Sequence, residues 1–293
     1  MPEPPLSQPR ALLGAAFSKL PPQLQRSTLH ALGRYAPWER QFDRRAPDAG
    51  PGLLTGPPDF VGVGVQKAGT SWWFDLLAGH PGAYHHSDFH KERHFFTHRF
   101  LEPLDDEGIA AYHRWFPRPP GRVTGEWTPD YLHQHWALPM IATAAPRAKL
   151  LVLLRDPVER YRSGLDHHRQ RGERLDAAIA TDAFARGLYG LQLERLERTV
   201  AREQVLVLLY EECRDDPAGQ LRRTLCFLGL DEEHVPASLG RPVSATAARH
   251  PLEPRQRDEL AERYEDDLAR LAALRPDLDL GRWPAAARLS GRG

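Results

Sequence analysis

The chain has 293 residues, 41% hydrophobic and 27% charged, which is typical of a folded globular protein. Basic and acidic residues both number 39, so the formal net charge is zero. A neutral chain lacks the overall field that drives binding to nucleic acid or to anionic membranes, and neither is expected as a partner. A local basic pocket is still compatible with this charge. The two cysteines, Cys213 and Cys226, cannot form a disulfide framework, and both are expected to be buried thiols.

The N-terminal segment lacks the pattern of a secretory signal, because it carries Glu3, several prolines and only a short apolar patch over residues 11–17. The longest aliphatic run, 150–154, is far shorter than the roughly 20 residues that cross a bilayer. Only four of the basic residues are lysines, a bias that points to a GC-rich, bacterial gene. We therefore expect a cytoplasmic bacterial protein without a membrane span. Where arginine is the default cation, a lysine marks a site that favours a compact ammonium.

Residues 1–56 are rich in Pro, Gly and Arg and predict an N-terminal extension and linker, followed by one domain over 57–293. Short aliphatic runs predict buried strands at 59–65, 148–154 and 204–210. Helices are predicted within 72–81, 157–170 and 215–230, and a further helix opens at Pro254. Alternating strands and helices predict an α/β fold with a central parallel sheet covered by helices on both faces. Such sheets bind ligands beyond the carboxyl ends of their strands.

The turn after the first predicted strand favours anion binding. It contains Lys67, Gly69, Thr70 and Ser71 and leads directly into a predicted helix. Helix N-termini present backbone N–H groups and a positive dipole end, and the lysine and the hydroxyls add further donors. Neither of two common nucleotide motifs fits: Lys67 precedes Gly69, unlike the lysine of GxxxxGK[ST], and GxGxxG is not completed. We interpret the turn as a phosphate or sulfate site rather than a plain structural turn.

The turn after the second predicted strand is also basic. Arg155 ends that strand, and Arg160, Arg162 and Ser163 follow on the predicted helix. A guanidinium beside a helix N-terminus can bind a dianionic phosphate through paired hydrogen bonds. The alternative is a structural pair between Arg155 and Asp156. Together with the first loop, the pattern indicates one ligand with two anionic ends.

Four segments resemble sulfotransferases that use 3′-phosphoadenosine 5′-phosphosulfate (PAPS). QKAGTSWW (66–73) resembles their 5′-phosphosulfate loop, and LLRDPVERYRSG (153–164) resembles their 3′-phosphate motif. KERHFF (91–96) and GEWTPDYL (125–132) resemble segments of the heparan-sulfate N- and 3-O-sulfotransferase branch. The likeness extends over about 58–283 and implies a P-loop-like three-layer fold, a sulfotransferase domain over 57–293 and sulfuryl transfer to an acceptor hydroxyl.

The resemblance also implies roles for individual residues. Lys67 is expected to contact the sulfuryl group, and Arg155 and Ser163 are expected to bind the 3′-phosphate. Glu92 falls where that branch places its catalytic base, and burial is expected to raise the pKa of this carboxyl. The 5′-phosphate is expected to be held by Ala68, Gly69, Thr70, Ser71 and Trp72, partly through backbone N–H groups. No metal is expected, because a sulfuryl group carries less charge than a phosphoryl group.

Two departures from the family pattern concern the acceptor and the lid. The glycan branch usually has lysine at the position of Trp127, so we expect an aromatic wall there and an acceptor that is flatter or less anionic than a sulfated glycan. In place of a Lys-Gly-Arg loop over the donor, the chain has ATAARHP (245–251), in which only Arg249 could supply charge. The acceptor is expected to be a small molecule or a glycan, bearing its hydroxyl on a sugar, lipid or secondary metabolite.

Several alternatives stay open. The base could be a histidine, His90 or His94, which with Trp127 and His167 are also candidates for contact with the acceptor. The histidines at 86, 90, 94 and 98 recur every four residues, but HKERH is not the HExxH motif of zinc enzymes, and a metal site is not favoured. The rival functions are a non-catalytic relative of the same fold and a nucleotide-kinase-like phosphate-binding protein.

Overall fold

The computed structural model describes residues 46–86, 90–97, 99, 103–240 and 250–291, together with Leu24 and Thr28. The chain divides into two units between residues 45 and 46, and the fold below is that of the second unit. The boundary expected at residue 56 stays a prediction, and most of the predicted N-terminal extension lies outside the described residues.

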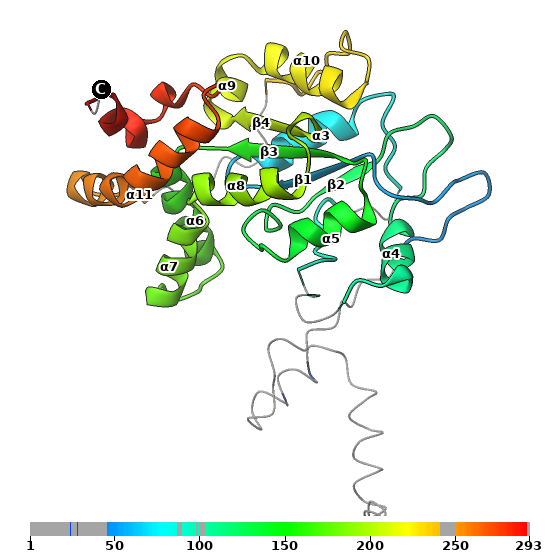
Figure 1. The fold of residues 1–293 in the computed structure, drawn as a ribbon, viewed down its shortest axis with the longest axis horizontal. Helices are drawn as coiled ribbons and strands as arrows, with labels where there is room; N and C mark the ends of the chain where they lie inside the picture. Colours follow the sequence, from blue (N-terminus) through cyan, green and yellow to red (C-terminus); the bar gives the residue numbers. More distant parts are fainter. Residues whose placement is uncertain are drawn as a thin grey trace, which may run out of the picture. The chain divides into compact units, whose positions relative to one another are not determined.

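The centre of the described fold is a sheet of four parallel strands in the order β2-β1-β3-β4 (Figure 1). The strands are β1 (Phe60–Gly64), β2 (Gly125–Trp127), β3 (Lys149–Leu154) and β4 (Val205–Leu209). Apart from the first residue of β3, every strand residue is buried, as expected for strands covered on both faces. The three strands predicted from aliphatic runs are confirmed, and the three-residue strand β2 is an addition.

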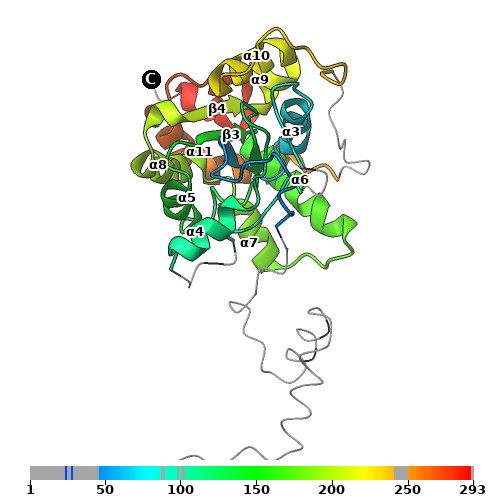
Figure 2. The same cartoon turned by 90° about the vertical axis from the view of Figure 1, so that its right-hand side faces the viewer.

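Helices cover both faces of the sheet and confirm the three-layer α/β fold. They are α3 (Thr70–Ala78), α4 (Asp106–His113), α5 (Ala137–Ala144), α6 (Pro157–Gln170), α7 (Ala177–Ala185), α8 (Tyr189–Thr199), α9 (Tyr210–Asp215), α10 (Pro217–Leu228) and α11 (Pro254–Leu274), with 3-10 turns η2 (Arg202–Gln204), η3 (Leu280–Arg282) and η4 (Pro284–Gly291). In two views 90° apart, α9 and α10 lie above β3 and β4, and α5, α7 and α8 lie below (Figures 1 and 2). The Trp73 indole on α3 donates to Thr224 on α10 at 3.1 Å, which joins these two helices.

Helix α10 shows how the periodic pattern sets burial. Leu221, Leu225 and Leu228 form its buried face, as the spacing predicts. Cys226 falls off that face and is exposed, so the expectation of two buried thiols is wrong for this residue, whereas Cys213 is buried. Among the described helices, none has the length and apolar character that a bilayer crossing requires.

The strand order places the two basic turns side by side. β1 and β3 are hydrogen-bonded neighbours, and both run in the same direction. Their carboxyl ends therefore meet at one edge of the sheet, where β1 leads into α3 and β3 leads into α6. This edge holds the candidate site.

Candidate active site

The turn between β1 and α3 forms an open helix N-terminus. Gly69, the residue before α3, has a φ of 88°, a left-handed conformation that favours glycine. A Cβ at this position would lie 2.9 Å from the Tyr210 ring, so space as well as conformation requires glycine. Within the described residues no side chain caps α3, which leaves its first backbone N–H groups available to an anion.

Lys67 lies in the same turn with a φ of 71°, uncommon for a residue with a side chain and frequent at functional turns. Its carbonyl accepts a hydrogen bond from Arg155 Nη1 at 3.1 Å, which ties the two basic turns together. Burial lowers the pKa of the Lys67 ammonium, and the positive charge of Arg155 lowers it further. Asp166 and Glu92 act in the opposite direction, so both carboxylates are close enough to stabilise the charged form.

Lys91 connects the start of α3 to the candidate base. Its ammonium donates to Thr70 Oγ1 at 3.2 Å and to Ser71 Oγ at 3.0 Å. The same nitrogen lies 3.0 Å from Glu92 Oε1, and the Lys91 side chain is only 16% exposed. One largely buried ammonium therefore bridges the hydroxyls of the phosphate loop and the carboxylate expected to act as base.

Glu92 is held by a cation and by a histidine. Its second oxygen accepts a hydrogen bond from His94 Nε2 at 3.2 Å. Burial alone would raise the pKa of Glu92, but the His94 hydrogen bond and the Lys91 charge outweigh burial and lower it to about 2. The expectation of a raised pKa is wrong, because it counted desolvation without these two partners. His94 also lies 3.7 Å from Asp130 Oδ2 and so stands between two carboxylates.

A buried polar cluster at the end of β2 fixes the backbone beside Glu92. The Thr128 hydroxyl accepts from the backbone N–H groups of Arg93 at 3.0 Å and His94 at 3.2 Å. Thr128 in turn donates to Glu126 Oε2 at 2.6 Å, and Tyr112 donates to Glu126 Oε1 at 2.8 Å. Because Glu126 is completely buried, these bonds satisfy a carboxylate that water cannot reach.

Trp127 does not face the site. Its side chain is completely buried, and its indole N–H donates to the Gly64 carbonyl at 3.0 Å. The ring occupies the space beside Gly62, where an added Cβ would lie 2.1 Å from it. The prediction that Trp127 forms an aromatic wall for the acceptor is therefore wrong, because the indole fills the core between β2 and β1.

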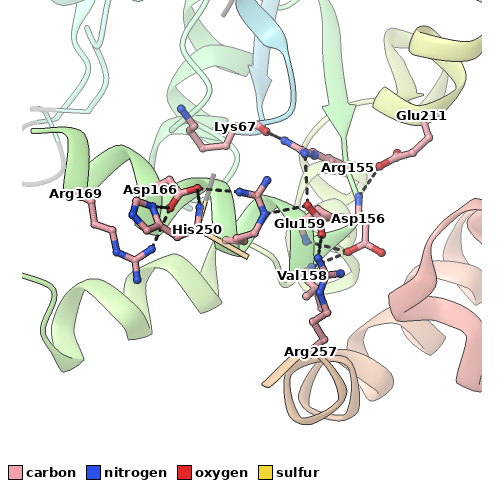
Figure 3. Close-up of polar contacts among 11 residues, drawn as sticks. Lys67, Arg155, Asp156, Val158, Glu159, Asp166, Arg169, Glu211, His250 and Arg257 are labelled. Carbon is pink, nitrogen blue, oxygen red and sulfur yellow. Dashed lines mark hydrogen bonds and ion pairs between the residues drawn. The ribbon is translucent and has the colours of Figure 1, made fainter. Parts of the chain in front are cut away.

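Asp156 caps α6 and changes the interpretation of the second turn. Its carboxylate accepts from the backbone N–H groups of Val158 at 2.9 Å and Glu159 at 3.0 Å (Figure 3). The backbone N–H groups at the start of α6 are thus satisfied internally, so an anion beside this helix would depend on side chains such as the Arg155 guanidinium. Arg155 is not paired with its neighbour Asp156: it bonds to the Lys67 carbonyl, lies 3.8 Å from Glu159 and stacks over Tyr210 at 5.0 Å.

Further along α6, the Asp166 carboxylate contacts three basic side chains. The carboxylate is 1% exposed and contacts Arg162 at 2.8 Å, Arg169 at 3.0 Å and His250 Nδ1 at 2.9 Å (Figure 3). Ser163, on the same helix, is also buried. Asp166 therefore holds His250, a described residue of the predicted lid segment 245–251, against the helix that carries Ser163. Arg249 itself lies outside the described residues.

Comparisons with known proteins agree with this geometry. Residues 57–240 match the sulfotransferase domain family. The chain belongs to the sulfotransferase family. Human heparan sulfate glucosamine 3-O-sulfotransferase 3B1 is 30% identical over 190 residues, 59% of this chain and 46% of that protein. Mouse heparan sulfate glucosamine 3-O-sulfotransferase 6 is 31% identical over 196 residues, 62% of this chain and 55% of that protein. The chain thus spans about half the length of these curated relatives.

A solved structure supports the fold. The sulfotransferase from Alicyclobacillus acidocaldarius aligns with a TM-score of 0.63 and 28% identity, covering 75% of this chain and 96% of that chain. Membership of the family and the α/β architecture expected from the sequence are both confirmed.

The other residues predicted for the site lie in different surroundings. His167 is half-buried on α6, and burial followed by the charge of Lys67 lowers its pKa, which places it near that ammonium. His90 is exposed. Ala68 and Trp72 are buried behind the loop. The Trp72 indole nitrogen is buried and has no hydrogen-bond partner within the described part of the chain.

The histidine pattern of this sulfotransferase does not form a stripe. The described residues 90–97 are not helical, and His94 has a φ of 55°. His98 lies outside the described residues. Across the residues that the structure describes, no group of three His, Cys, Asp or Glu side chains is arranged to hold a metal ion.

Sequence reasoning missed Lys91 and Asp130, to which it assigned no role. A signal for Lys91 was available, since it is one of four lysines in an arginine-rich chain and stands directly before Glu92. Asp130 gave no comparable signal. It forms an ion pair with Arg186 and approaches His94, and both contacts depend on how distant segments fold together.

Proposed function

We propose that this sulfotransferase transfers the sulfuryl group of PAPS to an acceptor hydroxyl. The observation that carries the proposal is the Lys91 ammonium, which contacts the hydroxyls of Thr70 and Ser71 and the Glu92 carboxylate at the same time. An anion seated at the start of α3 would therefore lie next to a carboxylate. This is the arrangement that a transfer reaction with a base requires.

The described residues fit the proposed donor at both ends. The uncapped N-terminus of α3 with Lys67, Thr70 and Ser71 offers donors for the 5′-phosphosulfate. Arg155, held in place by the Lys67 carbonyl, is the candidate for the 3′-phosphate, with Ser163 on the following helix. The buried Trp72 N–H needs an acceptor that the described protein residues do not supply, and a nucleotide offers several. Arg249, in the predicted lid segment 245–251, remains a candidate for contact with the donor.

The proposed reaction is an in-line displacement at sulfur. The bond from the acceptor oxygen to sulfur forms while the bond from sulfur to the bridging oxygen of the 5′-phosphate breaks, which leaves 3′-phosphoadenosine 5′-phosphate. The Lys67 ammonium offsets the negative charge that builds on the leaving oxygen. The proton of the acceptor hydroxyl passes to the Glu92 carboxylate. No metal is required in this scheme.

His94 is the alternative base. It is bonded to Glu92 and approaches Asp130, so a proton received by either member of the Glu92–His94 pair is shared through one hydrogen bond. His90, exposed at the start of the same segment, is a weaker candidate because it has no described link to this pair. Glu92 is preferred because it is the member in contact with Lys91.

The acceptor is proposed to be a small molecule or a glycan with a free hydroxyl on a sugar, lipid or secondary metabolite. The relatives named above are heparan sulfate glucosamine 3-O-sulfotransferases, which favours a sugar hydroxyl. The expectation of a flatter or less anionic acceptor rested on Trp127 and no longer applies, because that indole is buried. His167, half-buried near Lys67, is retained as a candidate for contact with the acceptor.

Two measurements test the function. The first compares thermal stabilisation of the protein by 3′-phosphoadenosine 5′-phosphate with stabilisation by ATP and Mg²⁺. A larger shift with the former is expected, a larger shift with ATP would favour a kinase-like protein, and no shift with either would refute the site. The second is a transfer screen with sulfur-labelled PAPS and hydroxyl acceptors. Binding without transfer to any acceptor would favour a non-catalytic relative.

A further inference from the structure

The Lys91 ammonium makes three polar contacts in the candidate site. An ammonium has three N–H donors, and Lys91 directs them to Thr70 Oγ1, Ser71 Oγ and Glu92 Oε1, all within 3.2 Å. With a side chain only 16% exposed, it is held at this point rather than extended into solvent. All three partners belong to the candidate site.

The position of the ammonium overlaps the place where an anion would bind. Thr70 and Ser71 are the first two residues of α3, and a ligand at a helix N-terminus accepts from these first residues. In the structure these hydroxyl oxygens accept hydrogen bonds from the Lys91 ammonium. When the hydroxyls turn to donate to an anion, the ammonium beside them is the nearest positive charge to its outer oxygens.

We propose that Lys91 is a second catalytic cation, which contacts the transferred sulfuryl group on the side facing Glu92, while Lys67 serves the leaving oxygen. The proposal rests on the proposed function and deepens it. It divides the work of the two lysines by position: Lys67 lies in the loop before α3 next to Arg155, and Lys91 lies between α3 and the base. The sulfuryl group passes between them from the leaving oxygen to the acceptor oxygen.

The contact also links donor binding to the base. Glu92 contacts Lys91 and His94, with Lys67 nearby, Asp130 beyond His94, and Asp75 of α3 near Lys91. A sulfuryl oxygen that draws the ammonium toward itself weakens the pair between Lys91 and Glu92. Glu92 then binds a proton more tightly and becomes the better base only after the donor has bound.

The experiment compares Lys91→Met, Lys91→Gln and Lys91→Arg with the matched control Lys149→Met. Lys149 begins β3, at the opposite end of that strand from the site, where it packs over the Phe227 ring. For each variant we would measure kcat, and the Kd for PAPS and for 3′-phosphoadenosine 5′-phosphate, which lacks the sulfuryl group. Lys91→Gln keeps two N–H donors without charge and serves if the methionine variant does not fold.

We expect Lys91→Met to lower kcat by about 100-fold, in the range for loss of one transition-state donor. The Kd for PAPS should rise at least about tenfold more than the Kd for the product nucleotide, because only PAPS carries the group that Lys91 contacts. Lys91→Arg should recover part of the rate. In the free enzyme, removal of the ammonium should also move the acid limb of kcat/KM to higher pH, since Glu92 loses a cation.

Two results would overturn the proposal while leaving the function intact. One is a kcat of Lys91→Met close to that of Lys149→Met. The other is an equal rise in Kd for PAPS and product nucleotide, which would assign Lys91 to the 5′-phosphate. If the unaltered protein binds neither nucleotide, the proposed function fails and the role of Lys91 fails with it.

Discussion

Thr128 and Glu126 share a 2.6 Å hydrogen bond inside the core, and through it β2 supports the segment that carries Glu92. The Thr128 hydroxyl also accepts the backbone N–H groups of Arg93 and His94, the two residues that follow Glu92. The segment that carries the candidate base is therefore held by side chains that are completely buried.

Thr128→Val should lower both the stability of the fold and kcat. It leaves a buried carboxylate oxygen and a backbone N–H short of partners, with an expected cost of about 2–3 kcal/mol in the free energy of unfolding. A displacement of Glu92 by about 1 Å should lower kcat by up to about 100-fold. Chemical denaturation and steady-state kinetics measure both, and Thr128→Ser should restore both. The control is Thr143→Val, an exposed threonine bonded only to its own helix, which should stay near wild type.

Lys67→Ala should remove nearly all turnover and weaken binding of the product nucleotide. The ammonium faces Glu92 and Asp166 in a partly buried site, where loss of one positive donor costs about 100- to 1,000-fold in kcat. Isothermal titration with 3′-phosphoadenosine 5′-phosphate measures the binding, and labelled transfer measures the rate. Unchanged turnover would remove Lys67 from the reaction.

Arg155→Ala should weaken the binding of a nucleotide that carries a 3′-phosphate more than the binding of one that lacks it. Affinity for 3′-phosphoadenosine 5′-phosphosulfate should fall at least about tenfold, as expected for loss of a charge-assisted contact, whereas affinity for adenosine 5′-phosphosulfate should change little. The latter ligand lacks only the 3′-phosphate, so the ratio of the two Kd values isolates that group. An equal loss for both ligands would assign Arg155 to holding the Lys67 turn through its carbonyl instead.

Glu92→Gln should abolish turnover with product-nucleotide affinity nearly kept. The pKa of Glu92 is lowered to about 2 from the ordinary 4.5, so its ionised form stabilises the fold above pH 4.5, and this contribution is lost as the pH falls toward 2. The Tm difference between wild type and Glu92→Gln should therefore be constant above about pH 5 and shrink below pH 4.5. Thermal unfolding between pH 7 and 3 measures it.

The pH dependence of kcat/KM separates the two candidate bases. Because the free enzyme keeps Glu92 ionised well below pH 4, a Glu92 base gives no acid limb near neutral pH. An imidazole base gives an acid limb between pH 5 and 8, where histidine side chains titrate as a class. Full activity of Glu92→Gln together with such a limb would move the base to His94, with His90 next.

Asp156→Ala should destabilise the fold more than removal of an ordinary helix cap. Besides capping α6, Asp156 accepts the Ala285 N–H at 3.0 Å and lies at 2% exposure, so three N–H groups lose an acceptor. We expect about 3 kcal/mol, compared with about 1 kcal/mol for Asp176→Ala, which removes the exposed cap of α7. Urea unfolding of the two variants tests the difference, and equal costs would contradict this account.

Most of the sheet and the residue types in its loops could be predicted because both depend on residues that are adjacent in the sequence. Aliphatic runs predicted β1, β3 and β4, and the lysine, glycine and hydroxyl residues after β1 indicated an anion site from their order along the chain alone. β2 was missed because three residues are too short to show a period. Neither alternation nor an aliphatic run can be recognised in Gly-Glu-Trp.

The errors concern contacts between distant segments. The prediction for Trp127 failed because the sequence alone does not show that β2 pairs with β1 so that the indole packs beside Gly62. The capping role of Asp156 at the start of α6 was not predicted, because the sequence reasoning considered only a pair between Asp156 and Arg155. The raised pKa expected for Glu92 assumed burial alone, whereas Lys91 and His94 reach it in the folded chain.

The fit between Gly62 and Trp127 restricts how this enzyme can be redesigned. Installing lysine at position 127, as the glycan branch has it, would leave part of the indole's space unfilled beside a residue with no side chain and would bury an ammonium there. A single exchange should therefore yield a weakened scaffold rather than a new specificity. Altering both strands together, with a bulkier residue at position 62 to refill the gap, is the combination that a directed library should encode.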